Sequence, residues 1–269
     1  MDASTLTALS WAAVGCGFTW LMTTAGSAVV FFFRSERRLM HHIFLGFAAG
    51  VMVAASVWSL LNPAIEQAEG QGVPGWLPAA GGFLLGVAFL MALDTLLPHL
   101  HADAEQPEGV PSGWKRTTLL VSAVTLHNIP EGMSVGLLFA MAAQAAGAAG
   151  EAYLGMAFAL AIGIGLQNFP EGAAISLPLA REGMSRRRAF VAGSLSGIVE
   201  PIFGVAVVLA AGWISPYMPW LLSFAAGAMI YVVVEELVPE AHLGEHSNVG
   251  TLGFIAGFVV MMVLDVALG

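Results

Sequence analysis

Two six-residue motifs of the same pattern carry most of the side chains that could bind a metal ion. The first is His127-Asn128-Ile129-Pro130-Glu131-Gly132, and forty residues later comes Gln167-Asn168-Phe169-Pro170-Glu171-Gly172. On a helix the fifth position projects between the first and the second, so each Glu lies between its two polar neighbours. Imidazole, carboxylate and amide groups together suit Zn(II), Fe(II), Mn(II) or Cd(II). These motifs therefore predict two adjacent cation sites that share both glutamates.

The charge pattern also indicates a cation. All nine Lys and Arg residues lie in three short stretches: 34–38, 115–116 and 181–188. Glu131, Glu171 and Glu200 instead lie inside long apolar runs. A charge at the bilayer centre costs from about 3 to well over ~10 kcal/mol, so such residues are usually paired or functional. Because no basic residue shares their layer, the missing positive charge must be a proton or a bound cation, which favours a metal transporter.

The composition predicts an all-α polytopic membrane protein. Hydrophobic residues make up 58% of the 269-residue chain and charged residues only 10%, unlike a soluble globular domain. Runs long enough to span a bilayer lie at 7–33, 39–61, 76–97, 117–146, 151–180, 189–213, 217–238 and 249–268. We therefore expect eight transmembrane helices in a single domain, 1–269. A lipid bilayer is then the surrounding medium, and nucleic acid is not an expected partner.

The basic stretches also predict the orientation. They fall in the first, third and fifth connections between the expected spans. The positive-inside rule assigns these connections to the cytoplasm and both termini to the outside. We expect the bacterial inner (plasma) membrane as the location, with a homodimer as the assembly to consider. The single Cys16 excludes an intrachain disulfide.

An internal duplication frames the two motifs. The segment 47–52, Phe-Ala-Ala-Gly-Val-Met, recurs as Phe-Ala-Ala-Gly-Ala-Met at 224–229, and Gly-Phe-x-x-Gly with a following Leu-Asp occurs at both 82–94 and 253–265. Faces of small residues that only pack helices would explain the glycines but not the aligned Phe, Met and Leu-Asp. The copies are five spans apart, so matching helices run in opposite directions. We expect an inverted repeat of helices 1–3 (1–97) and 6–8 (189–269) around a central metal-binding pair (117–180), an arrangement found in many transporters.

With Glu200-Pro201 added, the two motifs resemble those of the ZIP (Zrt/Irt-like protein) metal transporters, specifically the GufA-like branch. The likeness covers essentially the whole chain. It implies transport of zinc, or of the related Cd, Fe or Mn ions, toward the cytoplasm through a two-metal midmembrane site. As the mechanism we expect alternating access, in which the central helices shift relative to the duplicated bundles. The likeness also implies one metal site formed by Met52, His127, Glu131, Gln167 and Glu171, and a second formed by Asn128, Glu131, Asn168, Glu171 and Glu200. Family members with Asp at the position of Asn168 carry one more negative charge, so we expect weaker occupancy of the second site here.

Most histidines lie on the side expected to be cytoplasmic. They are His41, His42, His99, His101, His242 and His246, accompanied by several acids. Our hypothesis is an exit path or a sensor of cytosolic metal, for which family likeness favours Asp94, His99, His101 and Glu236. The alternative is that these residues are polar only because the connections are in water.

Three other functions use similar residues. A selective channel could have the same ligands, and a proton-coupled carrier of another solute could use the same carboxylates for protons. An intramembrane metalloenzyme would need a metal with an open position and a separate base, but the chain has no His-Glu-x-x-His helix. We therefore expect no enzymatic activity and no resident cofactor, with the divalent metal as transported substrate.

Overall fold

The structure is a computed structural model that describes residues 3–33, 38–98, 110, 116–241 and 248–268. This described part consists of helices and their connections, with no strand. The longer helices are α1 (Ala3–Ser27), α2 (Arg38–Ala55), α4 (Trp76–Leu96), α5 (Arg116–Gln144), α6 (Ala148–Arg181), α7 (Arg186–Ser196), α8 (Val199–Ile214), α9 (Met218–Val232) and α11 (Val249–Leu268). The shorter elements are α3 (Asn62–Gly70), α10 (Val238–Ala241), the 3-10 turns η1 (Ala28–Phe31) and η3 (Ser215–Tyr217), and the π-helical turns η2 (Ser56–Leu61) and η4 (Val233–Leu237).

Six stretches of the described residues are long and apolar enough to cross a membrane. They are Ala3–Phe31, Leu39–Gly70, Trp76–Leu96, Ala148–Arg181, Arg186–Ala241 and Val249–Leu268. The predicted all-helical membrane protein is therefore confirmed. Arg186–Ala241 has 56 residues and contains two of the expected runs. The helix α5 is not among the six, because the polar residues of its own motif lower its hydropathy.

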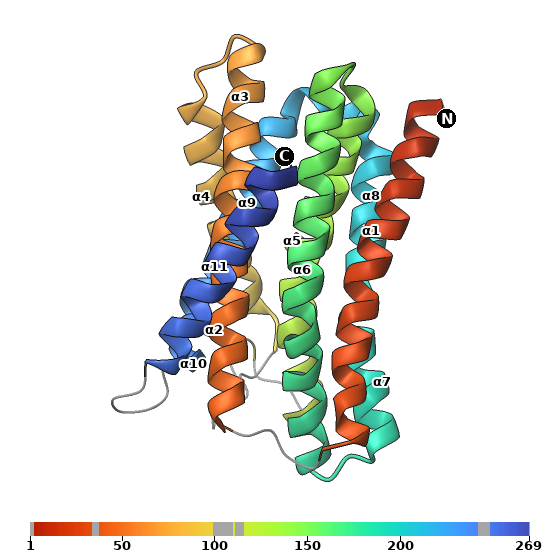
Figure 1. Cartoon of the computed structure of the whole chain (residues 1–269), viewed down its shortest axis with the longest axis vertical. Helices are drawn as coiled ribbons and strands as arrows, with labels where there is room; N and C mark the ends of the chain where they lie inside the picture. The colour runs from red at the N-terminus through yellow and green to blue at the C-terminus, as the bar shows by residue number, and fades with distance from the viewer. Residues whose placement is uncertain (1–2, 34–37, 99–109, 111–115, 242–247, 269) are drawn as a thin grey trace.

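The long helices form two side-by-side groups along the long axis of the molecule (Figure 1). In one group α1 packs along α6, and α5 packs along α8, with α7 beside α1 and α6. In the other group α2 packs along α11, and α4 packs along α9. The groups meet where α6 contacts α2 and α11 and where α5 contacts α9. The central helices α5 and α6 thus share their group with α1, which precedes them in the sequence, and α8, which follows them.

Glycines allow the closest helix pairs to approach through their backbones. A Cβ atom added to Gly50 on α2 would collide with the Phe254 carbonyl on α11, and one added to Gly86 on α4 would collide with the Phe224 carbonyl on α9. Small residues at such positions let helices pack tightly within a membrane. These two contacts explain why the glycines of the duplicated segments occupy the buried helix faces.

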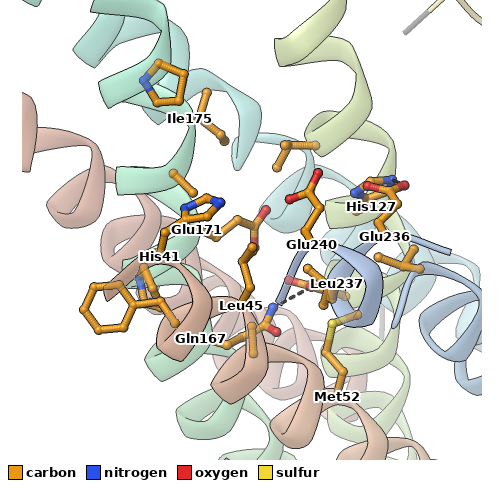
Figure 2. Close-up of a pocket in the computed structure, with 18 residues that line it drawn as sticks. His41, Leu45, Met52, His127, Gln167, Glu171, Ile175, Glu236, Leu237 and Glu240 are labelled. Carbon is orange, nitrogen blue, oxygen red and sulfur yellow. Dashed lines mark hydrogen bonds and ion pairs between the residues drawn. The ribbon is translucent and has the colours of Figure 1, made fainter. Parts of the chain in front are cut away.

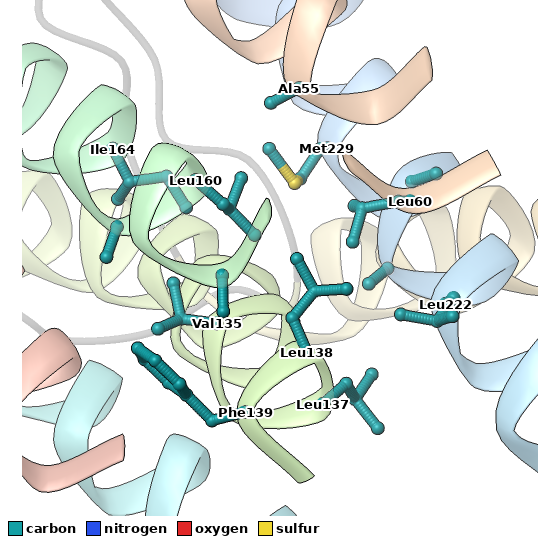
Figure 3. Packing of buried hydrophobic residues seen from close by; sticks show 14 of the residues in the cluster. Ala55, Leu60, Val135, Leu137, Leu138, Phe139, Leu160, Ile164, Leu222 and Met229 are labelled. Atoms are coloured by element: carbon teal, nitrogen blue, oxygen red, sulfur yellow. The ribbon is translucent and has the colours of Figure 1, made fainter. Parts of the chain in front are cut away.

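A fully buried apolar cluster fills the space between the two groups at the end nearer the chain termini (Figure 3). Leu138 on α5 and Leu160 on α6 lie there with Leu60, Leu222 and Met229 of the other group, and each has 0% exposed surface. On α5 the cluster follows the first motif, and on α6 it precedes the second motif. The motifs therefore lie on one side of a close-packed apolar layer.

Candidate metal site

A break between α7 and α8 sets the position of Glu200. Pro201 has no backbone N–H, and the Glu200 N–H donates to the Gly197 carbonyl at 3.1 Å in a tightened turn. In a regular α-helix the Glu200 N–H would instead donate to the Ser196 carbonyl, four residues earlier. That carbonyl accepts a hydrogen bond from Asn128 Nδ2 on α5 at 3.2 Å. This cross-link holds the first motif against the helix break, with Asn128 and Glu200 both fully buried.

Side chains from α5, α6 and α8 then join in one buried network. Gln167 Nε2 donates to Glu131 Oε1 at 2.6 Å and to Asn168 Oδ1 at 3.0 Å. Asn168 Nδ2 donates to Glu200 Oε1 at 3.0 Å and to Glu200 Oε2 at 2.9 Å. The structure therefore brings Glu131, Gln167, Asn168 and Glu200 together, although they are far apart in the sequence.

Four acceptor atoms of the motifs are buried without a hydrogen-bond partner: Asn128 Oδ1, Glu131 Oε2, Gln167 Oε1 and Glu171 Oε1. Buried polar atoms in proteins are nearly always hydrogen-bonded, and an unpaired one is costly. All four are oxygen atoms with lone pairs and no proton to offer when the carboxylates are ionised. A cation would satisfy them, whereas an apolar ligand would not.

One cavity gives access to part of this network (Figure 2). Met52 and Gln167 lie at one end, and His41 and Glu240 lie among the residues that line it further along. The lining runs along α2 and α6 away from the apolar cluster, toward the end of the molecule where α2 begins and α6 ends. Among the described residues that line it there are four glutamates and two histidines but no Lys or Arg.

The cavity distinguishes the two predicted metal sites. All five residues of the first site line it: Met52, His127, Glu131, Gln167 and Glu171. The three residues specific to the second site, Asn128, Asn168 and Glu200, are buried outside its lining. Within the described part of the chain, no group of three or more His, Cys, Asp or Glu side chains is assembled as a metal site. His127, Glu131 and Glu171 are therefore not close enough to form a ligand set by themselves. Gln167 and Met52 would have to complete the first site.

One of the predicted exit residues reaches the site itself. The Glu236 carboxylate on η4 lies 2.5 Å from His127 Nε2, and Glu236 lines the same cavity. His41 also lines the cavity, with its ring centre 6.3 Å from that of His42. Asp94 lies elsewhere, on α4, where Tyr231 Oη donates to its Oδ2 at 3.2 Å. The other histidines of the predicted exit path, His99, His101, His242 and His246, lie outside the described residues.

The surroundings of Glu200 include a residue that the motif analysis missed. Thr23 Oγ1 on α1 lies 3.5 Å from Glu200 Oε1. The sequence held a signal for Thr23. The offset of 177 residues that relates Phe47 to Phe224 also relates Thr23 to Glu200. The other missed contact, from Tyr231 to Asp94, has no comparable sequence signal.

Comparison with known proteins shows the family of this chain. A family model described as ZIP Zinc transporter matches residues 112–265, a stretch that includes both motifs and Glu200. The chain belongs to the ZIP family of zinc transporters. Human Zinc transporter ZIP11 is 40% identical, over 96% of this chain and 97% of its own length. Zinc transporter GufA of Myxococcus xanthus is 40% identical, over 84% and 86%, and Zinc transporter ZIPB of Bordetella bronchiseptica is 36% identical, over 97% and 82%.

Membership of the ZIP family confirms the resemblance on which the predicted function depended. The family is one of transporters and is not an enzyme class. The apolar helices and the named relatives together make this ZIP family member an integral membrane protein.

Proposed function

We propose that this ZIP family member carries divalent metal ions, zinc first, across the membrane toward the cytoplasm. The observation that carries the proposal is a set of three buried oxygen atoms without partners, on Glu131, Gln167 and Glu171, which line a cavity that no described Lys or Arg lines. Such a site has a deficit of positive charge that a cation corrects. The relatives named zinc transporters support zinc as the substrate. Cd, Fe and Mn ions have the same ligand preferences and are further substrates to test.

The ligands that we propose are the residues of the first site: Met52, His127, Glu131, Gln167 and Glu171. Carboxylate, imidazole and thioether groups together favour a borderline-soft dication over Mg(II) or Ca(II). Glu236 already contacts His127 Nε2, so an arriving ion must displace this carboxylate or bind it as well. Glu236 then serves as the first step of the exit path, ahead of Asp94, His99 and His101.

We further propose eight transmembrane helices related by an inverted repeat, with α5 as one span and Arg186–Ala241 as two. Helix contacts support it, because the glycine contacts between α2 and α11 have counterparts between α9 and α4. Gly257 lies against the Phe47 carbonyl in the same way that Gly86 lies against the Phe224 carbonyl. The π-helical turns η2 and η4 also begin four residues after Met52 and Met229, which the duplication equates.

Alternating access is the mechanism that we propose, with the described conformation open to the cytoplasm. The cavity leads toward the end of the molecule where α6 ends at Arg181 and α7 begins at Arg186, while the apolar cluster lies at the other end. Movement of the α1, α5, α6 and α8 group relative to the α2, α4, α9 and α11 group would open that end instead. An inward membrane potential of 100 mV supplies about 2.3 kcal/mol per charge, roughly 4.6 kcal/mol for a dication. We place the protein in a bacterial inner (plasma) membrane with both termini outside, and we propose a homodimer.

Uptake of radioactive zinc into proteoliposomes tests the proposal. Glu171→Gln removes a carboxylate from the cavity, and Glu151→Gln makes the same change at an exposed position of the same helix. We expect Glu171→Gln to abolish uptake and Glu151→Gln to leave it at the wild-type rate. Wild-type liposomes that take up no more zinc than empty ones would refute metal transport. Uptake that requires a proton gradient would identify coupling, and rates that do not saturate with zinc would indicate a channel.

A further inference from the structure

The amides of Gln167 and Asn168 form a hydrogen-bonded chain that begins at Glu200 and ends beside the cavity. Glu200 does not line the cavity, whereas Gln167 does. The direction of each hydrogen bond in this chain decides which amide atom can face a cation, an inference that rests on the proposed function.

Hydrogen-bond chemistry dictates the orientation of both amides. Asn168 faces Glu200 with its amide nitrogen, which suits a carboxylate because an ionised carboxylate only accepts hydrogen bonds. Asn168 Nδ2 uses its two protons on the Glu200 carboxylate, at 3.0 and 2.9 Å, and on the Thr19 carbonyl at 3.4 Å. Asn168 Oδ1 therefore points the other way and accepts from Gln167 Nε2 at 3.0 Å. Gln167 Nε2 donates its second proton to Glu131 Oε1 at 2.6 Å.

Gln167 Oε1 is the atom that remains. It is buried and has no hydrogen-bond partner, and it belongs to a residue that lines the cavity beside Met52 and Glu171. Because both protons of Nε2 are engaged, the amide cannot turn over without breaking two hydrogen bonds. The chain of contacts thus presents an oxygen to the cation and keeps the nitrogen, which would repel a cation, turned away.

Glu200 differs from the other two intramembrane glutamates in its own hydrogen bonds. Glu131 and Glu171 each retain an oxygen atom without a partner, but both Glu200 oxygens accept hydrogen bonds. Glu200 also has 0% exposed surface. Its donors are neutral amide and hydroxyl groups, which supply partial positive charge without an ion.

We propose that Glu200 is a positioning residue and not a metal ligand. Acting through Asn168, it holds Gln167 Oε1 toward the cation. The amide nitrogens of Asn168 and Gln167 occupy the space between Glu200 and Glu131 that a second cation would need. The protein therefore binds one divalent cation per chain in these helices, and Asn168 determines this number.

Counting bound zinc on the purified full-length protein in lipid nanodiscs tests this proposal. Equilibrium dialysis against zinc alone, followed by elemental analysis, gives both the stoichiometry and Kd. We expect one zinc per wild-type chain and two for Asn168→Asp, because a carboxylate at this position leaves the Glu200 oxygens to a cation. Asn62→Asp makes the same charge change at an exposed position of α3 and should still bind one zinc.

The variant Glu200→Gln separates positioning from ligation. A Gln side chain can present its own N–H to Asn168, which lets the chain of amides turn over. We expect the stoichiometry to stay at one while Kd rises by about 10- to 100-fold, the usual effect of losing a residue that orients a ligand. A ligand of a second metal would instead lower the stoichiometry from two to one with the first Kd unchanged.

Each other outcome overturns a stated step. Two zinc ions on the wild-type chain, or an unchanged Kd in Glu200→Gln, would refute the positioning role. A single zinc on folded Asn168→Asp would refute exclusion of the second ion by the amide. If this variant does not fold, the wild-type stoichiometry and the Glu200→Gln titration decide. A wild-type chain that binds no zinc would refute the proposed function itself.

Discussion

Gly132, the last residue of the first motif, ties the position of Glu200 to a backbone contact between α5 and α8. A Cβ atom added to Gly132 would meet Glu200 backbone atoms, with the carbonyl carbon only 2.7 Å away, whereas an ordinary contact is 3.4–4 Å. A backbone cannot move aside by changing a side-chain rotamer. The two helices must therefore separate by about 1 Å to restore van der Waals contact, and α8 carries Glu200 away from Asn168.

The variant Gly132→Ala should therefore lose stability and zinc uptake together, although no ligand is changed. Overpacking of a close contact costs about 1–3 kcal/mol. For a chain of this size, that lowers Tm by about 2–12 °C. Thermal unfolding in detergent, followed by tryptophan fluorescence, measures the first effect, and zinc uptake into proteoliposomes measures the second.

The variant Gly212→Ala is the matched control on α8. A Cβ atom there meets nothing within 4 Å. Alanine stabilises a helix interior over glycine by about 0.5–1 kcal/mol, so Tm should rise slightly and uptake should not change. The two substitutions are thus expected to shift Tm in opposite directions. A Gly132→Ala protein with wild-type Tm and uptake would show that α5 and α8 do not meet as described.

Two further expectations concern the cavity and a buried carboxylate. The first uses single cysteines in a background whose native cysteine is replaced by alanine. A cysteine at Ala174, which lines the cavity, should react with a membrane-impermeant thiol reagent from the cytoplasmic side, whereas a cysteine at the fully buried Leu138 should not. Equal labelling of the two variants would contradict the inward-open conformation. Ser59 Oγ donates to Asp265 Oδ1 at 2.5 Å and Oδ2 has no partner, so Ser59→Ala should destabilise the protein by about 1–3 kcal/mol. Ser10→Ala, at an exposed serine, is the control in the same unfolding assay, and an equal loss in both variants would contradict the assigned contact.

The amino-acid sequence by itself determined the class of protein and the chemistry of the site. Helical periodicity is local, so the spacing within 127–132 and 167–172 placed each Glu between two polar side chains before any fold was known. The exclusion of Lys and Arg from the apolar runs is likewise visible in the distribution of residues along the sequence. Both features predicted cation binding, and the family comparison confirmed the resemblance to ZIP transporters.

The proposed division of those residues into ligands and supports required the tertiary structure. Helix packing, which depends on contacts between distant segments, placed Glu236 against His127 and left Glu200 outside the cavity. An amide has a donor end and an acceptor end, and only its neighbours decide which end faces a cation. The sequence shows that Gln167 and Asn168 are polar, but their orientation comes from Glu131 and Glu200, which other helices bring to them.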